Sequence, residues 1–432
     1  MGERLVSSGT HPRADCWDGG SVGRKEHYLV SLDVGTKTVA AIVAEALEDG
    51  SIDIIGFGVV EGQGVRRGVV VNLEAAVESI KKAVEEAELT AGVEIGSVHL
   101  GLSGAHLKAF NSRGVVAVSG ANPEITHGDV RRAIDAAKGV ALPAGREILH
   151  VLPQDFVVDD QEGIDQPVGM KGTRLEVNVH VVTGSISSKQ NIISSVNKAG
   201  LRVGDTVMVH LAAAESVLTD DERELGVAIV DIGAGTTDLG IFEGGSLWHT
   251  SVIEMGGEHF TNDIAVGLRT PIPDAEKTKR RSGCALAFLV NEDETIEVAS
   301  VGGRDPRVIK RRIVSEVLQP RAEELFHAIW DEIRRAGYER SLKSGIVLCG
   351  GGALLQGMSE VAEQIFNLPI RLGCPVDVGG LTDHVNSPDF ATGVGLVKYA
   401  HRQQLREEER FAGVGWLNRL NIWLRERFKM AV

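Results

Sequence analysis

The sequence predicts an α/β protein built from two similar lobes, and three observations support this. Glycine is abundant, with 52 residues, while aromatic residues make up only 4% of the chain, a composition typical of folds with many tight strand-to-helix turns. A chain of 432 residues is long enough to bury the cores of two or more domains. Finally, one strand–turn–strand pattern occurs twice, 198 positions apart (231 − 33). A repeat over that distance indicates a duplicated lobe.

Charge and cysteine content limit the function classes. The formal net charge of −15 argues against a general nucleic-acid binder, which needs a basic face to neutralise phosphates. The four cysteines are scattered without C-x-x-C spacing, which indicates a reducing compartment and no metal knuckle. We interpret residues 1–26 as a disordered extension, because they lack an apolar run of signal-peptide length. No segment approaches the roughly 20 apolar residues that span a bilayer, so we expect a cytoplasmic chain whose membrane contact is peripheral.

The first copy of the repeated pattern lies at residues 27–44, and the second lies at residues 226–242. In each copy an apolar strand ends in an aspartate, the chain turns at a glycine beside a threonine, and a second apolar strand follows. The residues singled out are Asp33, Gly35, Thr36 and Lys37 in the first copy and Asp231, Gly233, Ala234, Gly235, Thr236 and Thr237 in the second.

The chemistry of these turns suits a phosphate ligand. Successive backbone N–H groups at such a turn can bind an anion, and glycine allows phosphate oxygens to approach closely. An aspartate beside an anion site fits a Mg²⁺ ion that keeps its waters, held through them near Asp33 and Asp231. Either loop alone could be an ordinary glycine-containing hairpin, but the second copy favours a phosphate site.

Two further glycine-rich turns precede predicted helices. A buried strand ends at Gly350, Gly351, Gly352 and Ala353, and a helix is expected over 358–366. The pair Gly256-Gly257 leads into another helix. Each turn alone is weak support for a ligand site, since such turns occur in many α/β folds.

Taken in their order along the chain, the two repeated loops, the Gly256-Gly257 pair and the turn at Gly350 resemble the actin/Hsp70/hexokinase superfamily. Within it they resemble the FtsA family of bacterial cell-division proteins. The resemblance runs from about Tyr28 to Phe428, and residues 213–226, 300–304 and 380–384 carry the closer likeness. It implies an actin-like two-lobed fold of duplicated RNase H-like lobes, with an inserted subdomain of the FtsA type (SHS2) and a C-terminal amphipathic helix.

The resemblance also implies a division of the chain. The expected units are residues 27–105, 184–225 and 370–400 for the first lobe, 106–183 for the insertion, 226–369 for the second lobe with a smaller partner-binding subdomain at 281–340, 401–415 for a linker, and 416–432 for a membrane-targeting helix. Within the insertion, alternating apolar and polar residues at 114–118 and 176–182 predict half-buried strands.

By the same resemblance the ligand would be ATP with Mg²⁺. Both repeated loops would contact the phosphates, Gly257 would lie against the nucleotide, and Gly350, Gly351, Gly352 and Ala353 would lie against its adenosine. Glu276 and Lys279 would reach the ribose and base. Without the family context, these two residues would be read as a solvated i,i+3 ion pair on a helix.

Two departures from the family pattern concern this site. Ala234 stands where many relatives have glycine, which is tolerable only if its φ is negative. Val209-His210 stands where the family usually has Glu-Pro, near the position that orients the attacking water. Because water positioning is a large part of such catalysis, losing a carboxylate there predicts at most weak ATPase activity. The sequence assigns no catalytic residue.

The last residues predict an amphipathic helix at a membrane surface. At about 100° per residue, one arc of the helix collects six apolar side chains. They are Trp416, Leu417, Leu420, Trp423, Leu424 and Phe428. Ile422 and Arg427 depart from the pattern, and the segment carries four basic side chains and one acid. This composition favours anionic lipid, and the plainer alternative is a terminal helix packed on its own domain.

Residues 306–320 combine apolar side chains at helical spacing with basic groups, which alone indicates a solvated helix face. By resemblance, this subdomain would bind the C-terminal tail of FtsZ, and Arg307, Lys310 and Arg311 would supply the basic contacts.

The predicted function is that of an ATP-binding, actin-like cell-division protein. It would anchor FtsZ filaments to the cytoplasmic face of the inner membrane at the division site, polymerise head to tail, and recruit later division proteins. One alternative is a pilus-assembly ATP-binding protein resembling PilM. The other is a sugar or acetate kinase of the superfamily, for which neither a catalytic aspartate nor an acceptor pocket can be assigned.

Overall fold

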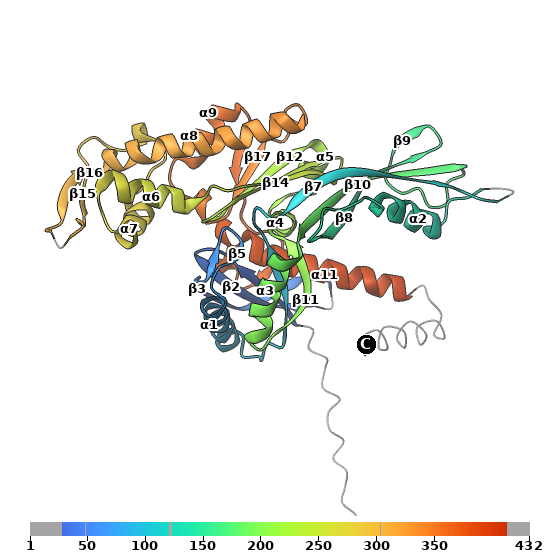
Figure 1. The fold of residues 1–432 in the computed structure, drawn as a ribbon, viewed down its shortest axis with the longest axis horizontal. Coiled ribbons are helices and arrows are strands. Elements are labelled where there is room, and N and C mark those ends of the chain that lie inside the picture. Colours follow the sequence, from blue (N-terminus) through green and yellow to red (C-terminus); the bar gives the residue numbers. More distant parts are fainter. Residues whose placement is uncertain (1–27, 48, 121–122, 303, 413–432) are drawn as a thin grey trace, which may run out of the picture.

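The computed structural model describes residues 28–47, 49–120, 123–302 and 304–412 (Figure 1). The extension predicted at 1–26 and the membrane helix predicted at 416–432 lie outside these residues. The described chain has two lobes and an insertion, each with its own sheet. No helix in the described part combines the length and hydropathy needed to cross a bilayer.

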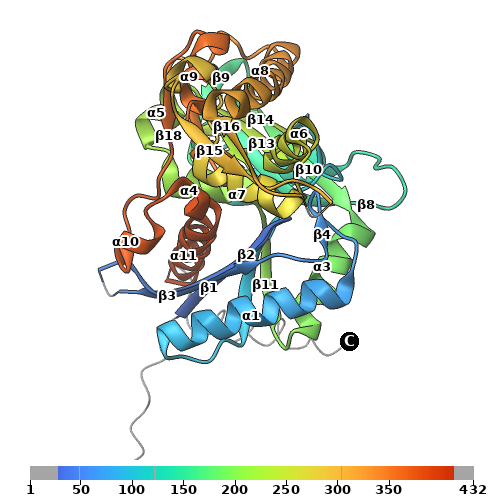
Figure 2. The same cartoon turned by 90° about the vertical axis from the view of Figure 1, so that its left-hand side faces the viewer.

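The first lobe is a six-stranded sheet with helices on both faces (Figure 2). In sheet order the strands are β11 (Arg202–Met208), β6 (Ser97–Leu102), β1 (Tyr28–Val34), β2 (Thr38–Ala46), β3 (Ile52–Glu61) and β19 (Gly379–Gly380). Helix α1 (Leu73–Ala91) packs on one face and helix α11 (Ala391–Ala412) on the other. Val30 and Leu32 join the core under α1, whereas Leu29 joins the core under α11. Burial on both faces explains why these strands are apolar throughout.

Smaller elements complete the first lobe. They are the short strands β4 (Val65–Arg66) and β5 (Val69–Val70), helix α3 (Ile186–Lys198) and helix α10 (Thr382–Val385).

The second lobe repeats the topology of the first. Its sheet runs β14 (Ser246–Ile253), β13 (Thr237–Glu243), β12 (Val227–Ile232), β17 (Ile346–Cys349) and β18 (Ile370–Leu372). In each lobe the repeated loop joins an antiparallel hairpin, and the hairpin's first strand pairs in parallel with a later strand: β1 with β6, and β12 with β17. The predicted duplication is therefore confirmed.

Helices and one hairpin complete the second lobe. They are α6 (Gly257–Leu268), α7 (Ile272–Ser282), α8 (Arg311–Ala336), α9 (Met358–Phe366), and the hairpin of β15 (Thr295–Val298) and β16 (Arg307–Lys310). The helices pack around the second-lobe sheet, and the hairpin contacts two of these helices, α7 and α8. The helices predicted after Gly257 and over 358–366 are confirmed.

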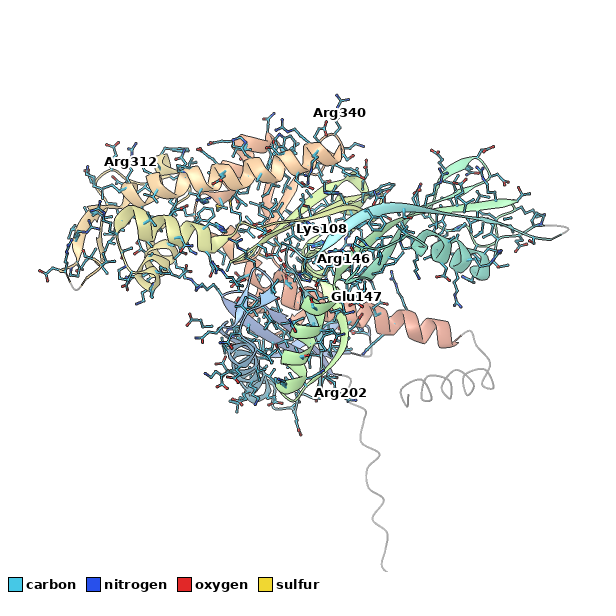
Figure 3. All side chains as sticks on the ribbon, in the orientation of Figure 1. Lys108, Arg146, Glu147, Arg202, Arg312 and Arg340 are labelled. Carbon is cyan, nitrogen blue, oxygen red and sulfur yellow. The ribbon has the colours of Figure 1, made fainter. Side chains whose placement is uncertain are left out.

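The insertion is a four-stranded sheet covered by one helix. Its strands are β7 (Lys108–Ala117), β10 (Arg174–Ser185), β8 (Arg146–Val158) and β9 (Gln161–Ile164), and α2 (His127–Lys138) packs on β7 and β10. The strand predicted at 176–182 lies within β10, and the one predicted at 114–118 is the end of β7. At the root of this sheet, Arg146 donates to the carbonyl of Thr183 at 2.8 Å, beside Lys108 (Figure 3).

The insertion also docks on the second lobe, a contact that the sequence did not predict. The amide nitrogen of Gln154 donates to the carbonyl of Leu247 at 3.1 Å, and Ser246 Oγ donates to the carbonyl of Gln154 at 3.0 Å. These bonds occupy the outer edge of β14, which would otherwise be the exposed edge of the second-lobe sheet.

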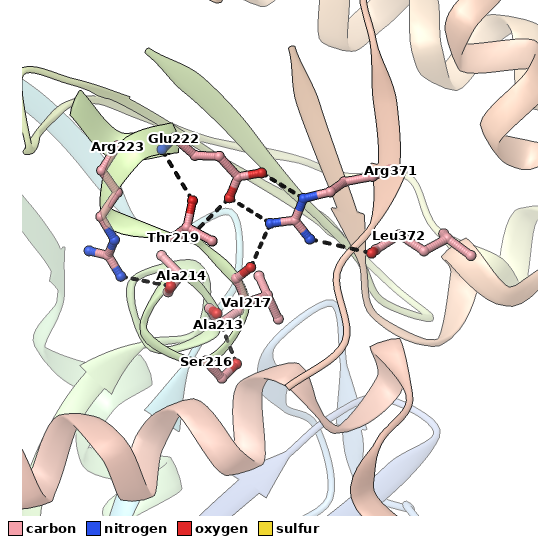
Figure 4. A network of polar contacts seen from close by, with 9 residues as sticks. All are labelled: Ala213, Ala214, Ser216, Val217, Thr219, Glu222, Arg223, Arg371 and Leu372. Carbon is pink, nitrogen blue, oxygen red and sulfur yellow. Dashed lines mark hydrogen bonds and ion pairs between the residues drawn. The ribbon is translucent and has the colours of Figure 1, made fainter. Parts of the chain in front are cut away.

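Helices α4 (Val209–Val217) and α5 (Asp220–Leu225) connect the lobes, and a polar network ties them to β18 (Figure 4). The guanidinium of Arg371 makes two 2.6 Å contacts with the carboxylate of Glu222 and donates to the carbonyl of Val217 at 2.7 Å. Glu222 also accepts from the backbone N–H of Thr219, closing the N-terminal cap of α5. This bidentate pair fixes the exit of the connecting helix against the second lobe.

The structure differs from two sequence expectations. Residues 401–412 of the predicted linker form the end of α11, because Gln, Leu, Arg and Glu are strong helix formers. Residues 307–310, expected in a helix, form β16, since Val308 and Ile309 are β-branched and pair with β15. Helix α8 begins only at Arg311.

Candidate nucleotide site

A cavity of about 640 Å³ lies between the two lobes. The first lobe contributes the loop after β1 and the end of β6. The second contributes the loop after β12, the start of α6, one side of α7, and the glycine turn after β17. Helix α11 adds Thr392 from its first turn. The cavity thus gathers four motifs that are far apart in the sequence.

The two repeated loops have the same local geometry. In the first, the N–H of Gly35 donates to the carbonyl of Thr38 at 2.9 Å. In the second, the N–H of Gly233 donates to the carbonyl of Thr236, also at 2.9 Å. Ala234 does not have a positive φ. The condition for tolerating alanine in place of glycine at this position is therefore met.

Two glycines at the cavity wall have no room for a side chain. A Cβ added to Gly235 would lie 2.7 Å from Thr36 Oγ1 of the opposite loop. Gly350 has φ near +80°, and a Cβ there would lie 2.2 Å from a carboxylate oxygen of Asp231. A side chain at Gly235 would therefore crowd the contact between the two loops, and one at Gly350 would crowd Asp231 within the second lobe.

Acidic groups gather at the floor of the cavity. Burial, together with the charges of Asp231 and Asp238, raises the pKa of Asp33 to about 7. Burial and the charge of Asp238 raise the pKa of Asp231 to about 6, although a 2.9 Å hydrogen bond from Thr392 Oγ1 opposes the rise. A cation near both carboxylates would relieve this repulsion, so the residues fit Mg²⁺ held through its waters.

Helix α7 supplies a charged pair to the cavity wall. Lys279 Nζ lies 2.8 Å from Glu276 Oε2 and donates to the carbonyl of Gly257 and to Thr261 Oγ1, both at 2.9 Å. Burial alone would raise the pKa of Glu276, but hydrogen bonds and charge from Lys279, with help from Thr261 and Arg280, lower it to about 2. The pair is therefore anchored to the start of α6 and is not a free surface ion pair.

Most residues predicted for the nucleotide line this one cavity. They are Asp33, Gly35, Thr36, Lys37, Asp231, Gly233, Ala234, Gly235, Thr236, Gly257, Glu276, Lys279, Gly350, Gly351 and Gly352. The structure places two others elsewhere. Thr237 points to the other face of β13 and donates to the carbonyl of Met255 at 2.8 Å, as strand alternation requires. Ala353 is turned into the second-lobe core.

The three basic residues predicted for the FtsZ tail do not share one surface. Arg311 lines the cavity between the lobes, and it donates to the carbonyl of Ser282 at 2.8 Å and to Gln356 Oε1 at 2.6 Å. Arg307 donates to the carbonyl of Leu268. Of the three, Lys310 alone is exposed on β16 and takes part in none of these contacts.

Several cavity residues escaped the sequence reading. Ser103 and Thr392 stand in no recognisable motif, and Arg311 was predicted for the FtsZ tail instead; long-range folding brings all three to the cavity. Asp238 had a signal, since it closes the Asp-Ile-Gly-Ala-Gly-Thr-Thr-Asp run of the second loop. At the departure Val209-His210, Val209 faces the cavity, whereas His210 is turned into the interior.

Solved structures share this architecture. The PilM–PilN type IV pilus biogenesis complex matches with a TM-score of 0.62 and 16% identity, covering 86% of this chain and 98% of that one. MreB5 of Spiroplasma citri bound to ADP matches with a TM-score of 0.51 and 17% identity, covering 89% and 98%. At these identities the likeness shows the fold alone. The chain therefore has an actin-like fold.

Sequence comparison narrows this class. Residues 104–183 match the family model of the SHS2 domain inserted in FtsA, and residues 228–395 match the model of cell division protein FtsA. The cell division protein FtsA of Pseudomonas aeruginosa is 48% identical over 376 residues, which are 87% of this chain and 90% of that protein. The chain therefore belongs to the FtsA family of cell-division proteins.

Proposed function

We propose that the chain binds ATP with Mg²⁺ in the cavity between its lobes. The observation that carries the proposal is the convergence of both repeated loops and the Gly350 turn on one cavity of about 640 Å³. The loops offer backbone N–H donors to phosphate oxygens, and Asp33 and Asp231 offer carboxylates to the waters of the cation. The anchored pair of Glu276 and Lys279 lies where the ribose and base would be bound.

On this basis we infer the role of a membrane adaptor in cell division. The chain would hold FtsZ filaments at the cytoplasmic face of the inner membrane, polymerise head to tail at the division site, and recruit later division proteins. Support comes from the identity with the cell-division protein of Pseudomonas aeruginosa and from the apolar arc and basic excess predicted for residues 416–432.

For the FtsZ tail we retain the surface of the β15–β16 hairpin. Lys310 is exposed there, and Val308 is 72% exposed beside it. A basic group next to an exposed apolar side chain suits a short peptide with acidic and apolar residues. Arg307 and Arg311 contribute through the fold of this surface, since their guanidinium groups hold the carbonyls of Leu268 and Ser282.

Co-sedimentation with liposomes in the presence of ATP tests the adaptor. The full chain and a chain truncated after Gly415 would each be mixed with anionic and with neutral vesicles. We expect only the full chain to pellet, and to prefer anionic lipid. If both chains stay in the supernatant, the membrane role is wrong. Phosphorylated small-molecule products formed equally by both chains would favour the kinase alternative instead.

Binding of ATP is tested separately, by titration with a fluorescent ATP analogue. Replacing Gly350 by Val is expected to abolish binding, because the new side chain would meet the Asp231 carboxylate. Gly96→Val is a matched control, since a Cβ at Gly96 meets no atom within 4 Å. Equal affinity of the two variants would contradict the proposed site.

A further inference from the structure

A hydroxyl from the first lobe lies between the two phosphate loops. Ser103 follows β6, lines the cavity, and is only half-buried. Its Oγ donates to Asp238 Oδ2 at 2.7 Å and lies 3.2 Å from Thr236 Oγ1 of the second loop. Ser103 is therefore a cavity-facing group whose orientation is set by a carboxylate behind it.

The carboxylate of Asp238 has one oxygen atom without a hydrogen-bond donor in the described chain. The side chain of Asp238 is buried, and its Oδ2 accepts from Ser103 and, at 3.3 Å, from Thr236 Oγ1. Its Oδ1 makes no hydrogen bond within the described chain. A buried carboxylate oxygen without a donor is costly, so a native structure keeps one only where something uses it.

The group opposite this oxygen is also unpaired. His210 is 1% exposed, and neither of its ring nitrogens makes a hydrogen bond to any residue that the structure describes. Its Nδ1 lies 3.9 Å from Asp238 Oδ1. An apolar side chain would fill this space without leaving buried polar atoms unpaired, so packing alone does not account for an imidazole here.

We propose that Ser103 is a catalytic residue for ATP hydrolysis in this cavity and that Asp238 and His210 are its positioning residues. The proposal rests on the proposed ATP site. The oxygen of a water forms a bond to the γ-phosphorus while the bond from that phosphorus to the β–γ bridging oxygen breaks. The water gives a proton to Ser103 Oγ, and Ser103 gives its own proton to Asp238. ADP, phosphate and one proton then leave.

This arrangement would replace the carboxylate that is missing at Val209-His210. The acid is not lost from the site but enters from the second loop, and the histidine at the altered position lies directly behind it. His210 stabilises the carboxylate in the geometry that receives the proton, as a buried partner does in other acid–base pairs. Activity is then expected to be slow, because a relay of three groups, Ser103, Asp238 and His210, replaces one direct base.

The surroundings of His210 bear on its pH response. The titratable groups that face it are His150 on β8, His180 on β10, Asp231 on β12, Asp238 on β13 and His249 on β14, and His106 faces Asp238. Burial lowers the pKa of His150 to about 4 and that of His180 to about 3, so both rings are neutral above pH 5. A change in rate between pH 6 and 8 therefore does not come from these two rings.

The test compares binding with turnover in the full chain. Ser103→Ala is expected to bind ATP as the wild type does but to hydrolyse it about 10²-fold more slowly in a single turnover. Ser103→Thr, which keeps the hydroxyl, is expected to restore most of the rate. Ser112→Ala, a hydroxyl deletion in the insertion, is the matched control and should change neither quantity.

Two further readouts separate catalysis from structure. Ser103→Ala should lose affinity for ADP with aluminium fluoride, a mimic of the transferring phosphate, while its affinity for ADP alone is unchanged. His210→Leu should lower the single-turnover rate and the affinity for ADP with aluminium fluoride without changing ATP affinity, which a merely structural histidine would not do. If the wild type binds ATP without hydrolysing it, or if Ser103→Ala keeps the wild-type rate, the relay is wrong while the ATP site stands. If ATP does not bind at all, the proposed function falls first.

Discussion

Raising the pH from 6 to 8 is expected to tighten Mg²⁺-dependent binding of ATP. The reason is the pair of carboxylates at the cavity floor, since Asp33 has a pKa of about 7 and Asp231 a pKa of about 6. The cation is favoured only when both are ionised. From these values, both are ionised in roughly 5% of molecules at pH 6 and in roughly 90% at pH 8. The Mg²⁺-dependent part of the affinity should therefore rise about 20-fold.

The same shifts act in the opposite direction on the ligand-free protein. Both folded-state pKa values lie above the ordinary aspartate value of 3.8, so the folded chain binds more protons than the unfolded chain over this range. The free energy of unfolding contributed by Asp33 and Asp231 is therefore largest below pH 3.8 and falls as the pH rises to about 7. Bound Mg²⁺ with ATP should restore what ionisation removes.

The assay is a titration with a fluorescent ATP analogue at half-unit steps of pH, with Mg²⁺ and with a chelator. Subtracting the chelated series removes the titration of the nucleotide itself. Asp33→Asn is the informative variant, because it keeps the shape of the side chain and removes the group with the higher pKa. If Asp33→Asn shows the wild-type pH dependence, or if the wild-type affinity is flat from pH 6 to 8, the reasoning about the two carboxylates is refuted.

Two stability predictions follow from the connecting helices. Arg371→Met should lower the free energy of unfolding by about 1–3 kcal/mol at pH 7, since it strands the half-buried Glu222 carboxylate, whereas Arg334→Met on an exposed pair should cost under about 1 kcal/mol. Because Arg371 helps to hold the pKa of Glu222 down, against its burial, the effect should fade as acid protonates Glu222, which chemical denaturation at pH 7 and pH 3 would reveal. Gly395→Ala should lower the free energy of unfolding by about 1–3 kcal/mol, because its Cβ would lie 1.9 Å from a backbone carbonyl oxygen of α4. The control Gly96→Ala, whose Cβ meets no atom within 4 Å, should change it by under about 0.5 kcal/mol. Equal losses of the two variants in thermal unfolding would contradict the packing of α4 on α11.

The fold could be predicted as far as its determinants are local. Each repeated loop is closed by a hydrogen bond between residues three apart, from Gly35 to Thr38 and from Gly233 to Thr236, and the glycine and threonine pattern indicates it directly. The strands around the loops could be predicted equally well, because a sheet that is covered on both faces has strands that are apolar throughout. The helix expected at residues 307–310 is wrong because the helical spacing of apolar residues in 306–320 runs across the junction of β16 and α8. Short apolar runs are ambiguous in this way.

The remaining features depend on contacts that sequence spacing does not encode. Thr392 reaches Asp231 across 161 positions, and Gln154 reaches the edge of β14 across 93. Arg311 stands beside Lys310 in the chain, yet its guanidinium belongs to the nucleotide cavity because α8 begins at that residue. Neighbours in a basic run therefore separate when a strand gives way to a helix between them.

The pair Val209-His210, which led to the prediction of weak ATP hydrolysis, also shows that sequence spacing does not encode long-range contacts. Read along the chain, Val209-His210 lacks the carboxylate that orients water, and the inference of weak hydrolysis follows. In three dimensions a carboxylate is present, because Asp238 comes from the second loop to within 2.7 Å of the cavity-facing Ser103, and His210 lies 3.9 Å from it on the inner side. A missing group at one position is thus not a missing group at the site. The proposed relay depends on the unpaired Oδ1 of Asp238 and the unpaired ring nitrogens of His210. The Ser103 and His210 variants test it directly.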